Sequence, residues 1–472
     1  MLDAMLHARS VAVIGASKGT TETGGSKIGA AALNYLVDHG FEGPIFPVNP
    51  RYEELAGRRC YANVRDIEDE VDLALIVLRA GACVQAMEDC AAKGVKVAVV
   101  FAAGFAEAGD SALQDRLLAA ARAGGVRLAG PNTNGFINAV DNLVCCTSSV
   151  SDINPFPGGD IAFIGQSGAL GGSMLGCAME EGSGFSYSVT TGNEADLGAA
   201  DYLDYLIDDD RVRVFALLLE GVGDVPKFLA AASKAARMRK PIVVYKVGLS
   251  DIGAEACVSH TSALAGSDRV FDAVCRQYGL IRVDDLAELL PTATVFSWVG
   301  DKLPRGNRVG IVTASGGISG VAADECHRWG LEIPELDAGT KAKIREFVPS
   351  YGSVRNPVDL TQQVRSFASA YQDAARMLLD LDTIDGVILL ATMVGEPRAS
   401  IYGKDFSTVA REASKPVIVG WTGPPGLASK GFPMLQATRT PTFRSARGAV
   451  KAMRRLYDYR TFLDRLAREA AE

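Results

Sequence analysis

The chain has 472 residues, of which 48% are hydrophobic and 22% are charged, and its formal net charge is −8. This composition is ordinary for a globular protein with a large core, and the length suffices for about three domains of ~150 residues. The acidic balance and the lack of a basic stripe argue against nucleic acid or an anionic membrane surface as a partner.

The amino-terminal segment and the cysteine pattern bear on the cellular compartment. The opening segment MLDAMLHARS contains the acidic Asp3 and does not resemble a signal peptide, and no apolar run approaches the ~20 residues of a membrane span. The nine cysteines are scattered without a CxxC pair, and the four histidines show no ligand spacing. We therefore expect a cytoplasmic protein with reduced thiols, no membrane contact and no structural metal.

Short apolar runs alternate with longer helix-like segments through the first ~150 residues, a typical domain length. The helix-like segments include residues 28–39 and 83–93. Strands without polar alternation are what a parallel sheet covered on both faces requires. Residues 1–150 are therefore predicted to form a doubly wound α/β domain, with strands at 11–15, 44–48, 73–78, 95–102 and 127–130.

Two further cycles follow the linkers INPFPGGD (153–160) and DKLPRGNR (301–308), which predicts domains at 151–300 and 301–472. FIGQSGALGG and IVTASGGISG align with an offset of 148 positions, and RKPIVVYKVG matches SKPVIVGWTG in the same order. Two matches in one order indicate an internal duplication. The strands expected in these domains lie at 161–165, 214–221 and 241–248, then at 309–315, 386–393 and 415–423.

The Gly-rich turn in VAVIGASKGTTETGGSKIG (11–29) links a strand to a helix, a geometry that presents backbone N–H groups to an anion. Its spacing fails GxGxxG, and the next strand ends at Val48-Asn49-Pro50 without an acidic residue for a ribose, so NAD is disfavoured. The turn could be only a tight connection. Lys27 favours phosphate binding.

Ordered motifs over some 350 residues carry a resemblance to a known family. They include VAVIGAS, PVNPRY, FAAGFAEAG, GPNTNGFIN, QSGALGG, TGNEAD, LEG, SHTSALAG, VDDLAELL, TASGGISG and NPVDLT. The chain resembles the α-type subunit of the NDP-forming acyl-CoA synthetases, the superfamily of succinyl-CoA synthetase and ADP-forming acetyl-CoA synthetase. The resemblance implies a Rossmann-like CoA-binding domain followed by two flavodoxin-like doubly wound domains.

The resemblance also implies roles for individual residues. His260 would carry a phosphoryl group and Glu220 would orient its ring. The phosphoryl group would lie near Ser167, Gly168, Ala169, Gly192 and Asn193. Coenzyme A would bind along Gly15, Ala16, Ser17, Lys27, Asn49, Pro50, Arg51, Val77, Arg79, Ala103, Gly104 and Asn132.

The implied activity is ligation of a carboxylic acid to coenzyme A with release of ADP and phosphate. No ATP-grasp domain is found in the sequence, so ATP, ADP and Mg²⁺ are expected on a partner subunit of the ATP-grasp β type. The expected assembly is a hetero-oligomer or a homodimer of this chain. Ser262, where relatives often have Gly, and the GPNTNG motif depart from the family pattern, and GPNTNG bears on the acyl or thiol end.

An imidazole suits the phosphoryl role because it attacks as a neutral ring and forms a labile N–P bond. It needs a carboxylate on its other nitrogen, which Glu220 can supply. A lone histidine is more often structural, but His260 lies in a Gly/Ser/Thr/Ala loop, which His7, His39 and His327 do not. Glu220 could be only a surface carboxylate at a strand end, and Asn193 only a loop cap.

Two other functions compete. GQSGA (165–169) nearly matches a serine-hydrolase elbow, but Ala169 replaces the final Gly and no Asp-then-His order follows. The second alternative is a CoA-binding regulatory or scaffold protein without ligase activity. Neither the identity of the acid nor the choice between ADP and GDP follows from the sequence.

Overall fold

The computed structural model describes residues 2–19, 28–250, 252–253, 267–362 and 369–471. These residues form two compact units, Met1–Ala293 and Thr294–Glu472, and each is considered separately. Among the described helices, none is long and apolar enough to cross a bilayer.

The first sheet of unit one is parallel, with strand order β2-β1-β5-β6-β7. Its strands are fully or largely buried, as expected when helices cover both faces. A two-stranded hairpin, β3 (Glu54–Leu55) and β4 (Arg58–Arg59), follows β2. The sheet contains β1 (Val11–Ile14), β2 (Ile45–Val48), β5 (Leu73–Ile76), β6 (Val97–Val100) and β7 (Arg127–Ala129), with helices α2 (Ile28–Asp38), α3 (Ala80–Lys93) and α4 (Ser111–Ala123).

The second sheet has strand order β14-β13-β12-β10-β11-β8-β9. β8 runs antiparallel to both of its neighbours, β11 and β9, and forms a hairpin with β9, whereas the other described pairs of this sheet are parallel. Its strands are β8 (Gly135–Asn138), β9 (Leu143–Cys146), β10 (Gly158–Gly165), β11 (Phe185–Thr190), β12 (Val214–Leu219), β13 (Ile242–Lys246) and β14 (Ile281–Arg282). The helices are α5 (Gly168–Glu180), α6 (Ala199–Leu206), α7 (Val225–Arg237) and α9 (Asp268–Tyr278), and α10 (Leu289–Val299) spans the boundary between the units.

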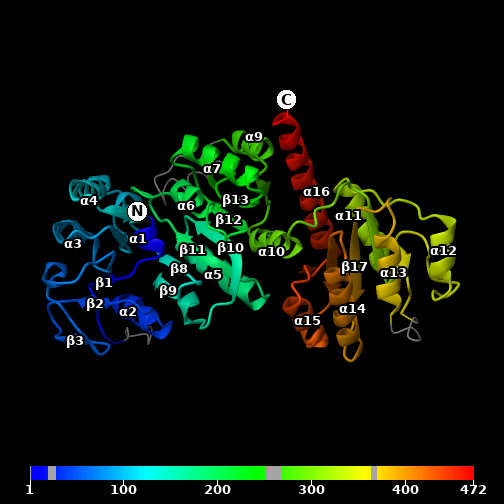
Figure 1. Ribbon diagram of the computed structural model, residues 1–472, viewed down its shortest axis with the longest axis horizontal. Helices are drawn as coiled ribbons and strands as arrows, with labels where there is room; N and C mark the ends of the chain where they lie inside the picture. The colour runs from blue at the N-terminus through cyan, green and yellow to red at the C-terminus, as the bar shows by residue number, and fades with distance from the viewer. Residues whose placement is uncertain (1, 20–27, 251, 254–266, 363–368, 472) are drawn as a thin grey trace. The chain divides into compact units, whose positions relative to one another are not determined.

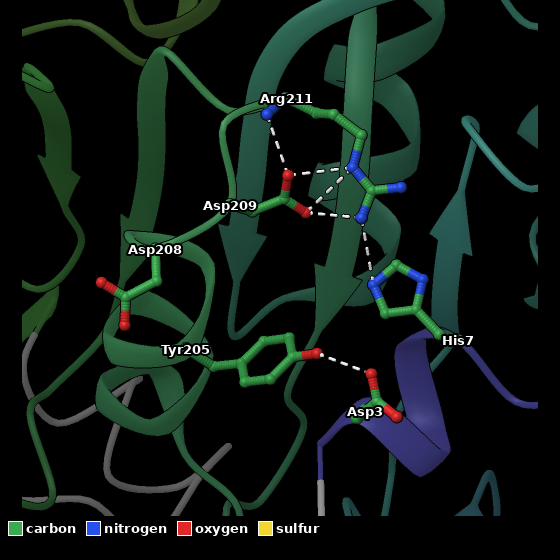
Figure 2. Close-up of a pocket in the computed structure, with 6 residues that line it drawn as sticks. All are labelled: Asp3, His7, Tyr205, Asp208, Asp209 and Arg211. Carbon is green, nitrogen blue, oxygen red and sulfur yellow. Dashed lines mark hydrogen bonds and ion pairs between the residues drawn. The ribbon is translucent and has the colours of Figure 1, made fainter.

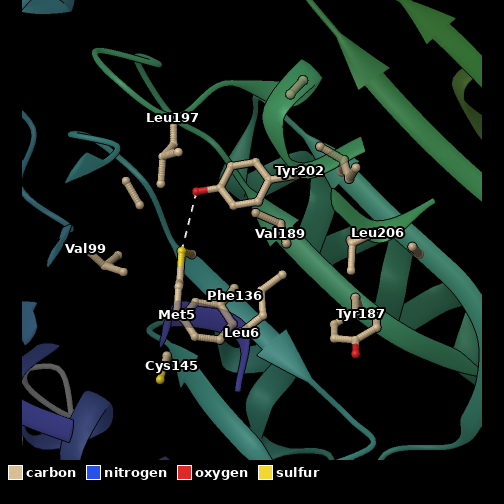
Figure 3. Close-up of a cluster of buried hydrophobic side chains, with 14 of the residues drawn as sticks. Met5, Leu6, Val99, Phe136, Cys145, Tyr187, Val189, Leu197, Tyr202 and Leu206 are labelled. Atoms are coloured by element: carbon tan, nitrogen blue, oxygen red, sulfur yellow. Dashed lines mark hydrogen bonds between the residues drawn. The ribbon is translucent and has the colours of Figure 1, made fainter. Parts of the chain in front are cut away.

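The short helix α1 (Asp3–Leu6) anchors the amino terminus in the core of unit one. Met5 and Leu6 are buried among side chains of the second sheet and of α6 (Figure 3). The Tyr202 hydroxyl lies 3.6 Å from the Met5 sulfur. Met5 and Leu6 therefore belong to one continuous apolar cluster that also contains side chains of the second sheet and of the first sheet.

Unit two contains one parallel sheet, with strand order β16-β15-β17-β18-β19. Its central strand, β17, is labelled in Figure 1. The largest fully buried side chain of this unit is Trp421, packed against Phe406 and Phe432. The strands are β15 (Val309–Thr313), β16 (Val358–Asp359), β17 (Gly386–Thr392), β18 (Val417–Thr422) and β19 (Thr442–Phe443), and the helices α11 (Gly316–Arg328), α12 (Ala338–Arg345), α13 (Ala370–Leu379), α14 (Arg398–Glu412), α15 (Gly431–Ala437) and α16 (Ala446–Glu469).

Counted along the chain, the five parallel strands of each sheet follow one order, 2-1-3-4-5, which is that of flavodoxin. The expected duplication has a close structural counterpart. Ser167 caps α5 and Ser315 caps α11, and the two helices begin and end 148 residues apart. The α/β fold class and the doubly wound architecture are confirmed.

The strands expected from apolar runs are all present, with ends that differ by a few residues. The β8–β9 hairpin was not anticipated, and it lies in the second sheet although it precedes residue 150. The structure groups the chain up to Ala293 as one unit, so the division at 150 and 300 stays a prediction about domains.

Candidate functional site

The residues expected to bind coenzyme A lie at one edge of the first sheet. They follow the carboxyl ends of its strands: Gly15–Ser17 after β1, Asn49–Arg51 after β2, and Val77–Arg79 after β5. The segment around Ala103 follows β6 and Asn132 follows β7. Strand order reverses between β1 and β5, and ligands of open α/β sheets bind in the crevice at such a point.

At Gly15 the backbone approaches the neighbouring strand end closely. Its φ is +90°, and a Cβ placed there would lie 2.7 Å from the Val77 carbonyl oxygen. The Asn49 side chain donates to the Ala16 carbonyl at 2.7 Å and accepts from the Arg51 N–H at 3.0 Å. Asn49 therefore joins the turn after β1 to the turn after β2.

Positive charge is available beside this groove. Lys18, Arg51 and Arg79 are exposed, and Arg79 directly precedes the 14-residue helix α3, whose N-terminus is a second source of positive potential. This arrangement fits an anionic ligand with several phosphates. Pro50 lies in the same turn as Asn49 and Arg51, whereas Lys27 lies outside the described residues.

The second candidate site lies at the carboxyl edge of the second sheet. Glu220 follows β12 and is buried, with 6% of its surface exposed. Gln166, itself 6% exposed, follows β10; its Oε1 accepts from the Glu220 and Gly221 N–H groups, and its Nε2 donates to the Gly221 carbonyl. Gln166 thus fixes the turn that carries Glu220.

The 13-residue helix α5 begins at this edge. Ser167 is its N-cap and makes no capping hydrogen bond to the helix, while Ala169 in the first turn is exposed. Gly168 has little room for a side chain, since a Cβ would lie 2.7 Å from the Asn134 amide. The first N–H groups of a helix attract an anion, so the start of α5 can hold a phosphoryl group.

Asn193 connects the two candidate sites. Its Nδ2 donates to the Glu107 carboxylate and, at 3.0 Å, to Gln114 Oε1, while its Oδ1 accepts from Asn132 at 3.2 Å. Beside it, Gly192 has a φ of +63°, and a Cβ there would lie 2.3 Å from the Pro131 carbonyl oxygen. The Asn193 side chain therefore holds the two edges together.

Glu107 is the acceptor at the centre of this link. Burial acts to raise its pKa, but hydrogen bonds from Asn193 and from the N–H groups of Gly104 and Phe105 hold the pKa below its ordinary value. Glu107 is therefore an anion at neutral pH, and it accepts from the N–H of Gly104, one of the residues expected to bind coenzyme A.

A further carboxyl group, Glu194, adjoins Gln166. Burial raises the pKa of Glu194, opposed by hydrogen bonds from Thr191, from the Ala199 N–H and from Gln166. The Thr191 and Ala199 contacts measure 2.8 and 3.0 Å. A chain of contacts thus runs from Glu194 through Gln166 to the turn at Glu220.

His260, the residue expected to be phosphorylated, lies outside the described residues. The chain leaves β13 at Lys246, on the carboxyl edge where Glu220 follows β12, and re-enters α9 at Asp268. The residues missed by sequence reasoning are Gln166, Glu107 and Gln114. Only Gln166 left a signal, as a polar residue directly after a fully apolar strand.

A polar pocket of about 480 Å³ lies at the opposite end of β12 (Figure 2). His7 is held by Asp141 at 2.7 Å and contacts Arg211 at 3.2 Å. Arg211 in turn pairs with Asp209 at 2.7 Å. These side chains bond to one another. Asp209 and Arg211 lie just before the first residue of β12, whereas Glu220 lies just after its last residue. This pocket is therefore separate from both candidate sites. Its lining residues are Asp3, His7, Tyr205, Asp208, Asp209 and Arg211.

Three family models match successive parts of the chain. Residues 9–139 match a CoA binding domain, residues 158–296 a succinyl-CoA ligase like flavodoxin domain, and residues 309–425 a Ligase-CoA domain. Their order follows the three sheets.

Whole-chain comparisons agree. The chain is 36% identical over 470 residues to the α subunit of acetate–CoA ligase [ADP-forming] I of Pyrococcus furiosus, covering 97% of each. It is 31% identical over 469 residues to a trans-feruloyl-CoA synthase of an unknown prokaryotic organism, covering 97% of this chain and 64% of that protein. A solved acetyl-coenzyme A synthetase 1 of Candidatus Korarchaeum cryptofilum, in complex with phosphate and ADP, superposes with a TM-score of 0.89 at 30% identity over 99% of both chains.

Proposed function

The chain belongs to the ADP-forming acyl-CoA synthetase family as an α-type chain, and we propose that its reaction passes through a phosphoryl group on His260. It is an acid–thiol ligase that uses coenzyme A and the ATP/ADP couple. The observation that carries the phosphoryl proposal is the buried Glu220, fixed by Gln166 at the edge where α5 begins and β13 ends.

In the thioester-cleaving direction, inorganic phosphate attacks the acyl carbonyl and coenzyme A leaves as the thiol. A neutral His260 nitrogen then attacks phosphorus, the P–O bond to the acyl group breaks, and the carboxylate departs. Glu220 accepts the hydrogen bond of the other ring nitrogen and stabilises its positive charge. The N–H groups at the start of α5, near Ser167 and Ala169, stabilise the phosphoryl oxygens.

The last step passes the phosphoryl group from His260 to ADP. We assign it to a partner subunit of the ATP-grasp type, with Mg²⁺ bound there beside the nucleotide. The relative from P. furiosus is named as an α subunit, which supports a partner. His260 would then relay between thioester chemistry on this chain and nucleotide chemistry on the other.

The relatives are named for acids as different as acetate and ferulate, and both are monocarboxylic acids. We propose a monocarboxylic acid, and we propose that coenzyme A binds along the first-sheet edge from Gly15 to Asn132. The exposed Arg51 and Arg79 would meet its phosphates there.

The direct test is phosphorylation of the isolated chain by acetyl, isobutyryl and phenylacetyl phosphate labelled at phosphorus, in parallel with γ-labelled ATP and the partner. We expect an acid-labile, base-stable label that His260→Asn abolishes. His327→Asn is the matched control, because His327 is exposed on α11 and should leave the label intact.

A label that survives in His260→Asn would contradict the proposal, since the nucleophile would then be another residue. Coenzyme A binding without any label, from any donor, would instead support a regulatory or scaffold protein, which family membership does not favour.

A further inference from the structure

A second cavity, of about 270 Å³, opens between α7 and α9 at the carboxyl end of β12 and β13. Its walls are apolar side chains from both helices, with Lys246 and Ser267 as the polar side chains that line it. Ligand sites for drug-sized molecules span about 300–1,000 Å³, so this cavity suits a small ligand. The lining residues are Leu219, Gly221, Val222, Val225, Phe228, Leu229, Lys246, Ser267, Val270, Phe271 and Val274.

Lys246 is the unusual member of this lining. Only 3% of its surface is exposed, and among the described residues its ammonium donates only to the carbonyl of its chain neighbour Val247, at 3.2 Å. An ammonium has three N–H donors, so the described residues leave two of them unused. A buried charge is costly unless it is paired, and a carboxylate is the counterpart of matching charge.

Strand geometry places Lys246 on the α7 face of the sheet. It pairs in register with Leu219, and in-register partners on parallel strands share a face. Leu219 packs with Phe228 of α7 in one apolar cluster. Glu220 directly follows Leu219, the last residue of β12, and strand alternation continued by one residue would turn its side chain to the other face. The cavity is therefore separate from the proposed phosphoryl site, although Leu219 and Gly221 on either side of Glu220 line it.

The start of α9 adds to the positive potential. Val225 is the first residue of α7, and Ser267 is the N-cap of α9 and makes no capping hydrogen bond to that helix. The N-terminus of α7 is capped by Asp224, whose carboxylate accepts from the Lys227 N–H, and Asp268 in the first turn of α9 pairs with Arg282 at 2.6 Å. The polar end of the cavity is cationic and the rest is hydrocarbon.

We propose that this cavity binds a small carboxylic acid with an apolar body, the carboxylate on Lys246 and Ser267 and the apolar part between Phe228, Phe271 and Val274. At the mouth, Val225 and Val270 are 48% and 63% exposed, as for a site open to solvent. Because Leu219 and Gly221 flank Glu220, a bound acid contacts the backbone that carries the proposed orienting carboxylate.

The test is titration of the full chain with hexanoate and with hexanamide, its neutral isostere, by calorimetry. We expect hexanoate to bind and hexanamide to bind at least about tenfold more weakly, because a charged hydrogen bond is lost. Lys246→Met should weaken hexanoate roughly 10- to 100-fold and leave hexanamide unchanged. Lys240→Met is the matched control, since Lys240 precedes the opposite end of β13 and its ammonium bonds the Ile207 and Asp209 carbonyls.

A second variant avoids the buried position. Val225→Asp places a carboxylate at the exposed mouth and should also weaken hexanoate, with coenzyme A affinity and the label on His260 unchanged. Equal affinities for hexanoate and hexanamide, or an unchanged hexanoate affinity in Lys246→Met, would overturn the proposal. Hexanoate binding is measured without any phosphorylation step. The proposal for this cavity and the proposal for His260 can therefore fail independently of each other.

Discussion

The side-chain amide of Asn132 donates to Oδ1 of Asn193 at 3.2 Å, joining the last loop of the first sheet to a loop of the second. Asn132 has a φ of +59°, and the Asn193 N–H donates to the Pro131 carbonyl at 2.9 Å. These two hydrogen bonds link the proposed coenzyme A groove to the proposed phosphoryl site. A rearrangement of either loop would therefore change these hydrogen bonds.

The Asn193 amide is expected to be essential to this contact. Asn193→Asp would replace a donor to Glu107 with a second carboxylate, so we expect a loss of about 1–3 kcal/mol in the free energy of unfolding at pH 7. Without the Asn193 donor, and beside a second carboxylate, the pKa of Glu107 should rise, so the loss should shrink as the pH falls towards about 4 and the carboxylates protonate. Urea unfolding at pH 7 and pH 4 measures both. Asn193→Ala introduces no carboxylate and so no repulsion with Glu107. If Asn193→Ala lost as much free energy of unfolding as Asn193→Asp, the charge argument would be contradicted.

Gly192 should tolerate no side chain. Gly192→Ala puts a Cβ 2.3 Å from the Pro131 carbonyl oxygen, in a backbone conformation with φ of +63°, and should cost about 2 kcal/mol or more. Gly176→Ala is the matched control, because Gly176 lies inside α5 with nothing near a new Cβ and should gain about 0.5–1 kcal/mol. Urea midpoints should therefore move in opposite directions; a common direction would be inconsistent with the steric explanation.

Gln166 is expected to act on phosphorylation through Glu220. Gln166→Leu removes the acceptor for the Glu220 and Gly221 N–H groups, so we expect the initial rate of His260 labelling to fall by about tenfold or more. Gln114→Leu is the control, as its side chain contacts Asn193 rather than the Glu220 turn. Coenzyme A affinity should be unchanged in both. Normal labelling in Gln166→Leu would show that the turn keeps its position without Gln166.

Asp209 is predicted to make stability depend on acid pH. Although burial alone would raise its pKa, hydrogen bonds from Arg211 and Tyr187 hold the pKa of Asp209 well below the ordinary value. The folded state therefore gains stability from the ionised carboxylate above about pH 4, and loses it as the pH falls through the depressed folded pKa. Asp209→Asn should cost about 2 kcal/mol at pH 7. That difference from the unsubstituted chain should narrow below pH 4, and a constant difference from pH 7 to pH 3 would refute the assignment.

Several parts of the fold could be predicted because they follow from local pattern. Apolar runs of four to six residues form the buried parallel strands, because both faces of such a strand are covered and polar side chains there would be buried. The offset of 148 between Ser167 and Ser315 appeared again as two helices of equal length. The β8–β9 hairpin was missed because its pairing with β11 depends on residues some fifty positions away.

The sequence by itself determined the family, through ordered motifs, and the likeness of the two later sheets, because strand and turn patterns are local. Only the tertiary structure decided how the candidate residues meet. It placed the five carboxyl strand ends of the first sheet on one edge, and it turned Asn193 toward Glu107 and Asn132. It also buried Lys246 in an apolar cavity. Such contacts join segments far apart along the chain, so no local pattern records them.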